Sequence, residues 1–300
     1  MKVYSKLDSI PRGNVSDRLI NGCMVLEGGA WRGLYSQGAL DALMQEDINL
    51  STTIGVSAGA MSAINYVSGQ IGRGPRFNLT YRHDSNYCGF GAMKRDHGVT
   101  GFHYLFEQME EMEPMNHERF DDPNRRFVVT ATDCLTGRQV YFEKGNCDIE
   151  TAVRASATVP YVSLPVMIEG RPYLDGGIAC KIPVDWAVDQ GFDKIVIIRT
   201  RDVSYRKAAK KPVELNRVEY GRKYPAIMRQ LMEETPAYNL LLDRIETLEK
   251  QGKVFVIAPS VPVGIHRFEG NMEKLGALYE QGYEDARSRM IALKKYLNID

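Results

Sequence analysis

The sequence is poor in cysteine, has no excess of either charge and has no long hydrophobic run. Its five cysteines are scattered and contain no Cys-x-x-Cys pair, which argues against a disulfide framework or a thiolate zinc site. Lys plus Arg and Asp plus Glu each number 38, so no net field would attract nucleic acid. These absences favour a reducing compartment and a protein without a nucleic-acid partner.

Membrane-spanning and secreted proteins are disfavoured as well. No stretch approaches the roughly 18 apolar residues that a transmembrane helix needs. Residues 1–21 mix Lys, Asp, Ser, Pro and Arg and lack the apolar segment of a secretory signal peptide. We therefore expect a soluble, cytoplasmic protein. The basic run at residues 206–211 suits transient contact with a membrane surface, although a solvated helix face or loop is the commoner role of such a run.

Short apolar runs alternate with segments of helical spacing. We expect strands at residues 23–26, 51–55, 126–132, 139–142, 166–168, 172–174, 194–200 and 253–258. We expect helices at residues 31–44, 58–67, 102–112 and 149–157, and within the stretches 203–251 and 271–297. Residues 69–125, rich in Gly, Arg, Tyr and His, are interpreted as an irregular excursion around the helix at 102–112. This alternation predicts an α/β fold with a mainly parallel sheet.

The segment Gly55-Val56-Ser57-Ala58-Gly59 stands between a predicted strand and a predicted helix. In a G-x-S-x-G turn of this kind the serine sits on a sharp bend with its hydroxyl exposed, and the glycines remove Cβ clashes. The N-terminus of the following helix adds positive partial charge and free N–H groups. The pattern favours Ser57 as a nucleophile that attacks ester bonds, although the same letters also occur in ordinary tight turns.

A second glycine-rich turn precedes the serine, Gly28-Gly29-Ala30-Trp31-Arg32-Gly33, again between a strand and a helix. Its spacing matches neither G-x-G-x-x-G nor the GK[ST] ending of a P-loop, which argues against a nucleotide site. Adjacent small residues can instead point successive N–H groups into one concavity and stabilise an oxyanion. Arg32 either holds this loop and adds positive potential or is an ordinary exposed residue at a helix start.

A serine nucleophile needs a proton acceptor, and two kinds are present. None of the five histidines lies in a compelling motif. The order Ser57, an aspartate, His266 matches an α/β-hydrolase triad, but the nucleophile of that fold follows more strands than the two found here. Asp175 ends a predicted strand and enters a glycine turn, which suits either a carboxylate aimed into a site or a simple hairpin turn. With an ordinary pKa of about 3.9, it would act better as a base if burial raised that pKa.

Taken in order, the loop at 28–33, the turn at 55–59 and Asp175-Gly176-Gly177 resemble the patatin-like phospholipase family. The pattern of that family is G-G-G-x-[RK]-G, G-x-S-x-G and D-G-[GA]. Residues 155–160 also resemble a segment that often precedes its aspartate. The resemblance implies a three-layer α/β/α fold. We expect a catalytic domain at residues 22–200 and a mainly helical extension at 201–300 that packs on it.

The resemblance implies a Ser–Asp dyad without histidine, with Ser57 as nucleophile and Asp175 as general base. It further implies hydrolysis of carboxylic esters in lipids, with release of fatty acid and without a metal or cofactor. The oxyanion hole is expected to use the backbone around Gly28, Gly29, Ala30, Arg32 and Ala58.

Ala30 departs from the pattern, because the family has a third glycine there. An alanine keeps its N–H, so the oxyanion hole can form if the backbone at this residue avoids positive φ. Two other functions stay open at this point. One is a triad esterase that uses His266, and the other is a patatin-like lipid-binding protein with impaired catalysis, for which Ala30 is a first hint.

Overall fold

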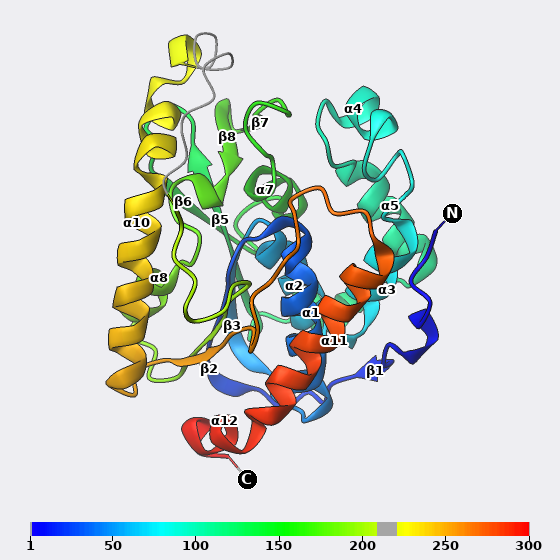
Figure 1. The fold of residues 1–300 in the computed structure, drawn as a ribbon, viewed down its shortest axis with the longest axis vertical. Helices are drawn as coiled ribbons and strands as arrows, with labels where there is room; N and C mark the ends of the chain where they lie inside the picture. Colours follow the sequence, from blue (N-terminus) through cyan, green and yellow to red (C-terminus); the bar gives the residue numbers. More distant parts are fainter. Residues whose placement is uncertain (1, 209–220, 300) are drawn as a thin grey trace.

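A mixed eight-stranded sheet lies at the centre of the computed structural model, which describes residues 2–208 and 221–299 (Figure 1). The strand order is β10-β9-β2-β3-β5-β8-β7, and β6 pairs with β5 outside this path. The strands are β2 (Ile20–Leu26), β3 (Leu50–Val56), β5 (Arg126–Asp133), β6 (Gln139–Glu143), β7 (Val166–Ile168), β8 (Arg171–Asp175), β9 (Ile195–Ile198) and β10 (Phe255–Ile257). Two short strands, β1 (Gly13–Asn14) and β4 (Gln70–Ile71), pair separately.

The strands from β10 to β5 are parallel, whereas β6, β7 and β8 join the sheet antiparallel. Leu26 of β2 pairs with Gly55 of β3, so the carboxyl ends of these strands lie together. Ala131 of β5 pairs with Asp175, which brings the end of β8 to the same edge of the sheet. Ligands of open α/β sheets bind outside the carboxyl ends of the parallel strands, so this edge is the natural place for a site.

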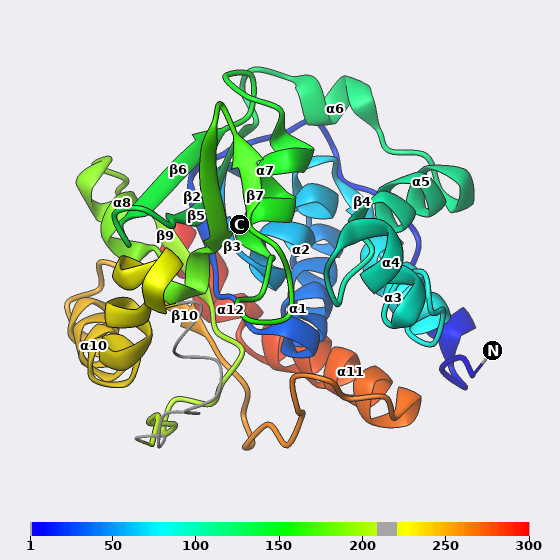
Figure 2. The same cartoon turned by 90° about the horizontal axis from the view of Figure 1, so that it is seen from above.

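Helices cover both faces of the sheet, because successive side chains of its central strands point to opposite sides. Met24 and Leu26 of β2 pack into one core, and Cys23 and Val25 pack into another. Over the first core lie α1 (Gly33–Gln45), α2 (Ala58–Val67), α7 (Ile149–Ser156), α11 (Met272–Ser288) and α12 (Met290–Leu297). Over the second lie α8 (Val184–Asp189) and α10 (Pro225–Lys250), so the predicted three-layer arrangement is confirmed (Figure 2).

The chain between β4 and β5 is helical, so the prediction of an irregular excursion was wrong. It forms α3 (Arg73–Tyr81), α4 (Phe90–Asp96), α5 (Phe102–Met112) and α6 (His117–Asp121), of which only α5 was expected. Helix α3 buries Arg73 and Arg76, whose guanidinium groups bond to Glu110 and Glu113. Part of the buried face of α3 is therefore made of paired arginines. The regular spacing of apolar residues that normally predicts a helix is missing from its sequence.

Residues 201–300 contribute to the sheet edge and to both helical layers. Strand β10 pairs with β9, α10 covers one face, and α11 packs along α1 on the other. The predicted helical stretch 203–251 contains α10, but its residues 209–220 lie outside the described part of the chain. The stretch 271–297 forms two helices, α11 and α12. The domain boundary near residue 200 stays a prediction.

Within the described residues the chain also forms three short 3-10 helices, η1 (Leu7–Ser9), η2 (Ala30–Arg32) and η3 (Gly176–Ile178). Two of them matter for the site, because η2 follows β2 and η3 follows β8 at the edge described above. Within residues 2–208 and 221–299, no helix has both the length and the apolar character that crossing a membrane requires.

Candidate active site

Ser57 occupies the single residue between the end of β3 and the start of α2. Its backbone has φ 55° and ψ −122°, a strained conformation for a residue with a side chain. The flanking glycine is required by packing, because a Cβ on Gly59 would lie 2.5 Å from the carbonyl oxygen of Leu26. The chain therefore turns sharply enough to hold the Ser57 hydroxyl at the start of the helix, as the sequence pattern predicts.

Asp175, at the end of β8, faces this serine. The Ser57 Oγ donates a hydrogen bond to Asp175 Oδ2 over 2.9 Å, and the Gly177 N–H donates to Oδ1 over 2.7 Å. The Asp175 backbone is fixed on both sides, because its N–H donates to the carbonyl of Thr158 and its carbonyl accepts from Thr132 Oγ1. The carboxylate is thus held by a strand end and a turn, and only one of its oxygens faces the serine.

Burial of the carboxylate raises the pKa of Asp175 above its ordinary value. The charge of Lys181 and the hydrogen bonds from Gly177 and Ser57 oppose that rise, because each of them stabilises the ionised form. The result is a carboxylate that binds a proton more readily than an exposed aspartate does. The sequence indicates that Asp175 would need burial to act as a base, but burial itself is visible only in the folded structure.

Ser156 is a member of the site that the sequence analysis did not single out. The Ser57 N–H donates to Ser156 Oγ over 2.8 Å, and Ser156 Oγ in turn donates to the Thr130 carbonyl over 2.6 Å. It therefore ties α7 and β5 to the strained serine turn. Ser156 lies within residues 155–160, which are part of the family resemblance. A serine at the end of a predicted helix in that segment is the signal that could have identified it.

The glycine loop at residues 28–33 lies directly against the serine. A Cβ on Gly28 would sit 3.2 Å from the Cβ of Ser57. The Gly28 N–H donates to the Lys181 carbonyl and the Arg32 N–H donates to the Gly29 carbonyl. Among the described residues, no hydrogen bond uses the N–H of Gly29, Ala30 or Ala58. Two of the five expected donors are therefore already bonded within the protein, and the other three have no acceptor in the described part of the chain.

Ala30 adopts φ 49°, so the condition that its backbone avoids positive φ is not met. A left-handed conformation costs a non-glycine residue about 1 kcal/mol, because Cβ approaches the following carbonyl oxygen. The loop thus has the conformation that suits the third glycine of the family pattern, and Ala30 adopts it with a strained backbone. The N–H of Ala30 is retained in that conformation.

Arg32 is half-buried, so it is not an ordinary exposed residue at a helix start. Burial and the nearby charge of Arg201 lower the pKa of Arg32, whereas Glu27 raises it. Glu27 is itself buried and accepts hydrogen bonds from the Tyr238 hydroxyl and the Thr200 N–H. Arg32, Glu27 and Tyr238 thus form a cluster beside the glycine loop that connects the loop to α10.

A cavity of about 460 Å³ opens beside Ser57. Its walls are mainly apolar, with large side chains from the glycine loop, α2, the segment between α3 and α4, α4 itself and the loop between β10 and α11: Trp31, Met61, Tyr87, Phe90, Met93 and Phe268. A volume of this size and lining is typical of a site for a small or medium organic ligand. Ser57, Ala30 and Ala58 thus line a mainly apolar chamber.

No histidine supports the serine in the described part of the chain. His266 is exposed on the loop before α11, and among the described residues no histidine forms a hydrogen bond with Ser57 or Asp175. His103 instead contacts Asp96, and His83 contacts the Gly270 carbonyl. Across residues 2–208 and 221–299, no three His, Cys, Asp or Glu side chains gather in a way that would hold a metal ion.

Comparison with known families gives two matches. A model described as patatin-like phospholipase matches residues 24–188, and a second model, a domain of unknown function, matches residues 224–298. The first covers more than half of the 300 residues and contains all three motifs of the sequence analysis. The second covers α10, β10, α11 and α12.

Two curated relatives are similar to part of this chain. The uncharacterized protein YjjU of Escherichia coli is 29% identical over 182 residues, which cover 59% of this chain and 51% of that protein. The probable lipid hydrolase 463L of invertebrate iridescent virus 6 is 26% identical over 183 residues, covering 55% of this chain and 62% of that protein. The chain therefore matches only a little over half the length of these relatives.

A solved structure, VipD from Legionella pneumophila, has a similar fold. It superposes with a TM-score of 0.50 at 14% sequence identity, covering 96% of this chain and 70% of the VipD chain. At this identity the likeness concerns the fold alone.

Proposed function

The chain belongs to the patatin-like phospholipase family, and from that premise we propose that it is a serine acyl hydrolase that cleaves carboxylic ester bonds of lipids and releases fatty acid. The observation that carries the proposal is the 2.9 Å hydrogen bond from Ser57 Oγ, at the wall of an apolar cavity, to a half-buried Asp175 whose pKa is raised by burial. An ester with an apolar acyl chain suits such a cavity, because burial of hydrocarbon supplies the binding free energy.

In the proposed first step, Asp175 accepts the hydroxyl proton of Ser57 while Oγ attacks the ester carbonyl carbon. The carbonyl π electrons move onto oxygen and form a tetrahedral oxyanion. When this intermediate collapses, the alcohol or lysolipid leaves with the proton held by Asp175, and an acyl-Ser57 ester remains. Water then attacks that ester with Asp175 as base, the fatty acid departs and the serine regains its proton.

The oxyanion is assigned to the N–H groups of Gly29, Ala30 and Ala58, since no acceptor in the described protein uses them. Donors of this kind each stabilise the developing charge by roughly 3 to 4 kcal/mol in known enzymes. Gly28 and Arg32 then have supporting roles, because their N–H groups hold the loop in shape. The dipole of α2 adds positive potential at Ala58.

A fluorophosphonate probe tests the proposal directly, because it forms a covalent bond only with an activated serine. We expect labelling of the full-length protein at the peptide that contains Ser57, as read by mass spectrometry. Hydrolysis of p-nitrophenyl butyrate should fall in proportion to the labelled fraction. A folded protein that neither reacts with the probe nor hydrolyses the ester would instead fit a lipid-binding protein with impaired catalysis.

Contact with a lipid surface is part of the proposal. The basic run at residues 206–211 supports such contact less well than the apolar side chains at the rim of the cavity do. In that run, Arg206 pairs with Asp243 and Glu246, and Lys207 pairs with Glu234. Residues 209–211 lie outside the described chain. The described cations of the run are therefore neutralised by α10, as expected for a solvated or structural charge cluster.

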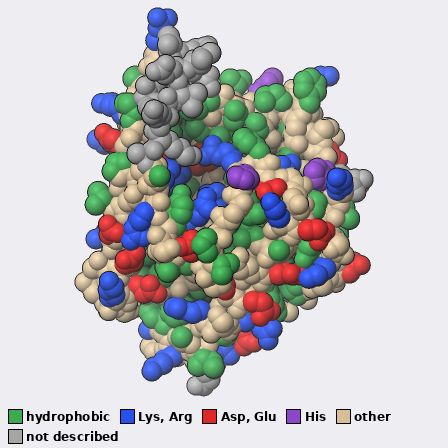
Figure 3. Space-filling view, in the orientation of Figure 1, with side chains coloured by type: hydrophobic (Ala, Val, Ile, Leu, Met, Phe, Trp, Pro, Cys, Tyr) green, Lys and Arg blue, Asp and Glu red, His purple; other side chains and the backbone are tan. Residues whose placement is uncertain are grey.

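The rim consists of three exposed apolar side chains that also line the cavity. Phe90 and Met93 of α4 are 83% and 42% exposed, and Phe268 is 61% exposed. Hydrophobic side chains gather over α4 at the top of the space-filling view (Figure 3). The exposed cations Lys94 and Arg267 flank this rim and suit anionic head groups. A lipid could thus pass from a bilayer into the cavity without exposing its chain to water.

Replacing Phe90 with aspartate is expected to weaken binding to vesicles of phosphatidylcholine and phosphatidylglycerol by at least about tenfold. The reason is that a buried phenylalanine contributes about 1.5–3 kcal/mol, and a carboxylate is repelled by the anionic surface. Sedimentation with the vesicles measures the effect. Ile291→Asp is the matched control, because Ile291 is 88% exposed on α12, at the opposite end of the molecule (Figure 1). Equal vesicle binding by the Phe90 variant and the parent would contradict the assignment.

The expectation of a cytoplasmic location and of activity without metal or cofactor stays part of this proposal.

A further inference from the structure

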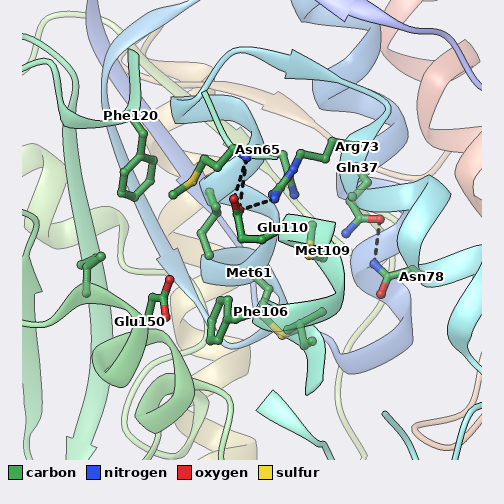
Figure 4. A pocket seen from close by; sticks show the side chains of 15 residues that line it. Gln37, Met61, Asn65, Arg73, Asn78, Phe106, Met109, Glu110, Phe120 and Glu150 are labelled. Carbon is green, nitrogen blue, oxygen red and sulfur yellow. Dashed lines mark hydrogen bonds and ion pairs between the residues drawn. The ribbon is translucent and has the colours of Figure 1, made fainter. Parts of the chain in front are cut away.

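A second, smaller hollow of about 60 Å³ lies between α2, α3 and α5 (Figure 4). Its apolar wall is made of side chains from α2, α5 and the segment that follows α5: Ile64, Leu105, Phe106, Met109, Met115 and Phe120. By volume it has room for roughly four groups the size of a water molecule or a methylene. It is thus too small for a ligand of its own but large enough for the end of a chain.

The hollow adjoins the active-site cavity, because Met61, Gln37 and Asn78 line both spaces. Met61 lies one helical turn beyond the serine, and its N–H donates to the Ser57 carbonyl. Asn78 Nδ2 donates to Gln37 Oε1 over 3.1 Å, as drawn in Figure 4. These three residues form a partition between the two spaces, made of the hydrogen-bonded pair Asn78 and Gln37 and the thioether side chain of Met61. Methionine is the most adaptable of the apolar side chains.

Arg73 is the one cation among the described residues that line the hollow, and it offers no free positive charge to a ligand, whereas Glu150 adds a carboxylate to the wall. Arg73 is buried, and its three nitrogen atoms donate to the Glu113 carbonyl, Asn65 Oδ1 and Glu110 Oε1. The ion pair with Glu110 balances its charge. A carboxylate or phosphate would have to break these bonds, whereas a hydrocarbon needs only the apolar wall. The chemistry of the hollow therefore fits the methyl end of an acyl chain.

We propose that this hollow receives the distal end of long acyl chains, that Met61 moves aside to admit it, and that Ile64 sets the depth available. The proposal rests on the proposed function for the position of the acyl ester at Ser57. Ser57, Met61 and Ile64 follow one another at helical spacing, so they lie along the same side of α2. A chain that leaves Ser57 along this side passes Met61 before it reaches Ile64.

Ile64→Trp tests the assignment, because Ile64 lines the hollow and not the active-site cavity. We expect the ratio of kcat/KM for p-nitrophenyl palmitate over p-nitrophenyl butyrate to fall by about 10- to 100-fold, since each excluded methylene is worth at least about tenfold in an apolar pocket. Ile291→Trp makes the same change at an exposed position on α12 and should keep the parental ratio. An unchanged ratio in folded Ile64→Trp would overturn the proposal.

Binding of fatty acids separates this inference from the proposed function. Palmitate and octanoate are titrated against Ser57→Ala, with and without Ile64→Trp, by displacement of a fluorescent fatty acid. We expect the added tryptophan to weaken palmitate more than octanoate, even if no ester is hydrolysed by any variant. Equal weakening of both acids, or of neither, would overturn it. Met109→Trp, at another residue that lines the hollow and not the active-site cavity, replaces Ile64→Trp if that variant does not fold, and the same outcomes apply.

Discussion

Replacing Ser57 with alanine is expected to lower the hydrolysis of p-nitrophenyl butyrate by about 10⁴- to 10⁶-fold, the range seen when a serine hydrolase loses its nucleophile. Alanine removes Oγ, so no acyl-enzyme can form, and the remaining rate comes from binding and the oxyanion donors. The backbone of the turn should persist, because it is held by the Ser156 hydrogen bond to the Ser57 N–H. Stopped-flow or plate-based release of p-nitrophenol measures the rate.

Ser68→Ala is the matched control for this change. Ser68 is buried at the end of α2, and its hydroxyl donates to the Asn65 carbonyl, away from the cavity. We expect that variant to keep a parental rate, which would show that loss of a buried serine hydroxyl near α2 does not itself remove activity. Parental turnover by a folded Ser57→Ala protein would mean that Ser57 is not the nucleophile.

Asp175→Asn is expected to lower kcat by about 10³- to 10⁴-fold with little loss of stability, the order of the penalty when the acidic partner of a catalytic serine is neutralised. An amide has nearly the same shape as the carboxylate and can still accept the hydrogen bond from Gly177 through its oxygen. It cannot accept the Ser57 proton, which is the role that the proposal gives to Asp175. Thermal unfolding confirms the fold, and initial rates give kcat.

Two controls accompany Asp175→Asn. Asp185→Asn makes the same change at a half-exposed residue that pairs with Arg244, and it should keep the parental rate. His266→Ala should also keep it, since His266 is exposed and has no hydrogen bond to the dyad residues in the described chain. Loss of activity in His266→Ala would instead favour the triad esterase, and parental activity in Asp175→Asn would remove Asp175 from the reaction.

The pH dependence of kcat/KM is a further readout of Asp175. A general base works only when it is ionised, so activity should rise with pH through the pKa of Asp175. Burial raises that pKa, so the rise should occur at higher pH than for an exposed aspartate. Lys181 opposes the burial effect, and Lys181→Met should therefore move the rise to still higher pH. A rise that stays in place would show that another group controls it.

Much of this site could be predicted from local sequence. The strands before residues 28 and 57, the helix at 58–67 and the two glycine turns depend on backbone geometry over a few residues. Glycine, serine and short apolar runs report that geometry directly. The same reasoning missed α3, because its buried face is made of Arg73 and Arg76, whose partners Glu110 and Glu113 lie far along the chain.

The sequence alone determined that Ser57 stands on a strand-to-helix turn, that a glycine loop precedes it, and that Asp175 ends a strand in the order of the patatin-like family. Only the tertiary structure decided that Asp175 lies 2.9 Å from a serine 118 positions away, that Ser156 braces the turn, and that a second hollow lies behind Met61. The physical reason is that local motifs encode local dihedral angles. Distances between motifs instead follow from strand order, here from the antiparallel pairing of β8 with β5 beside β3.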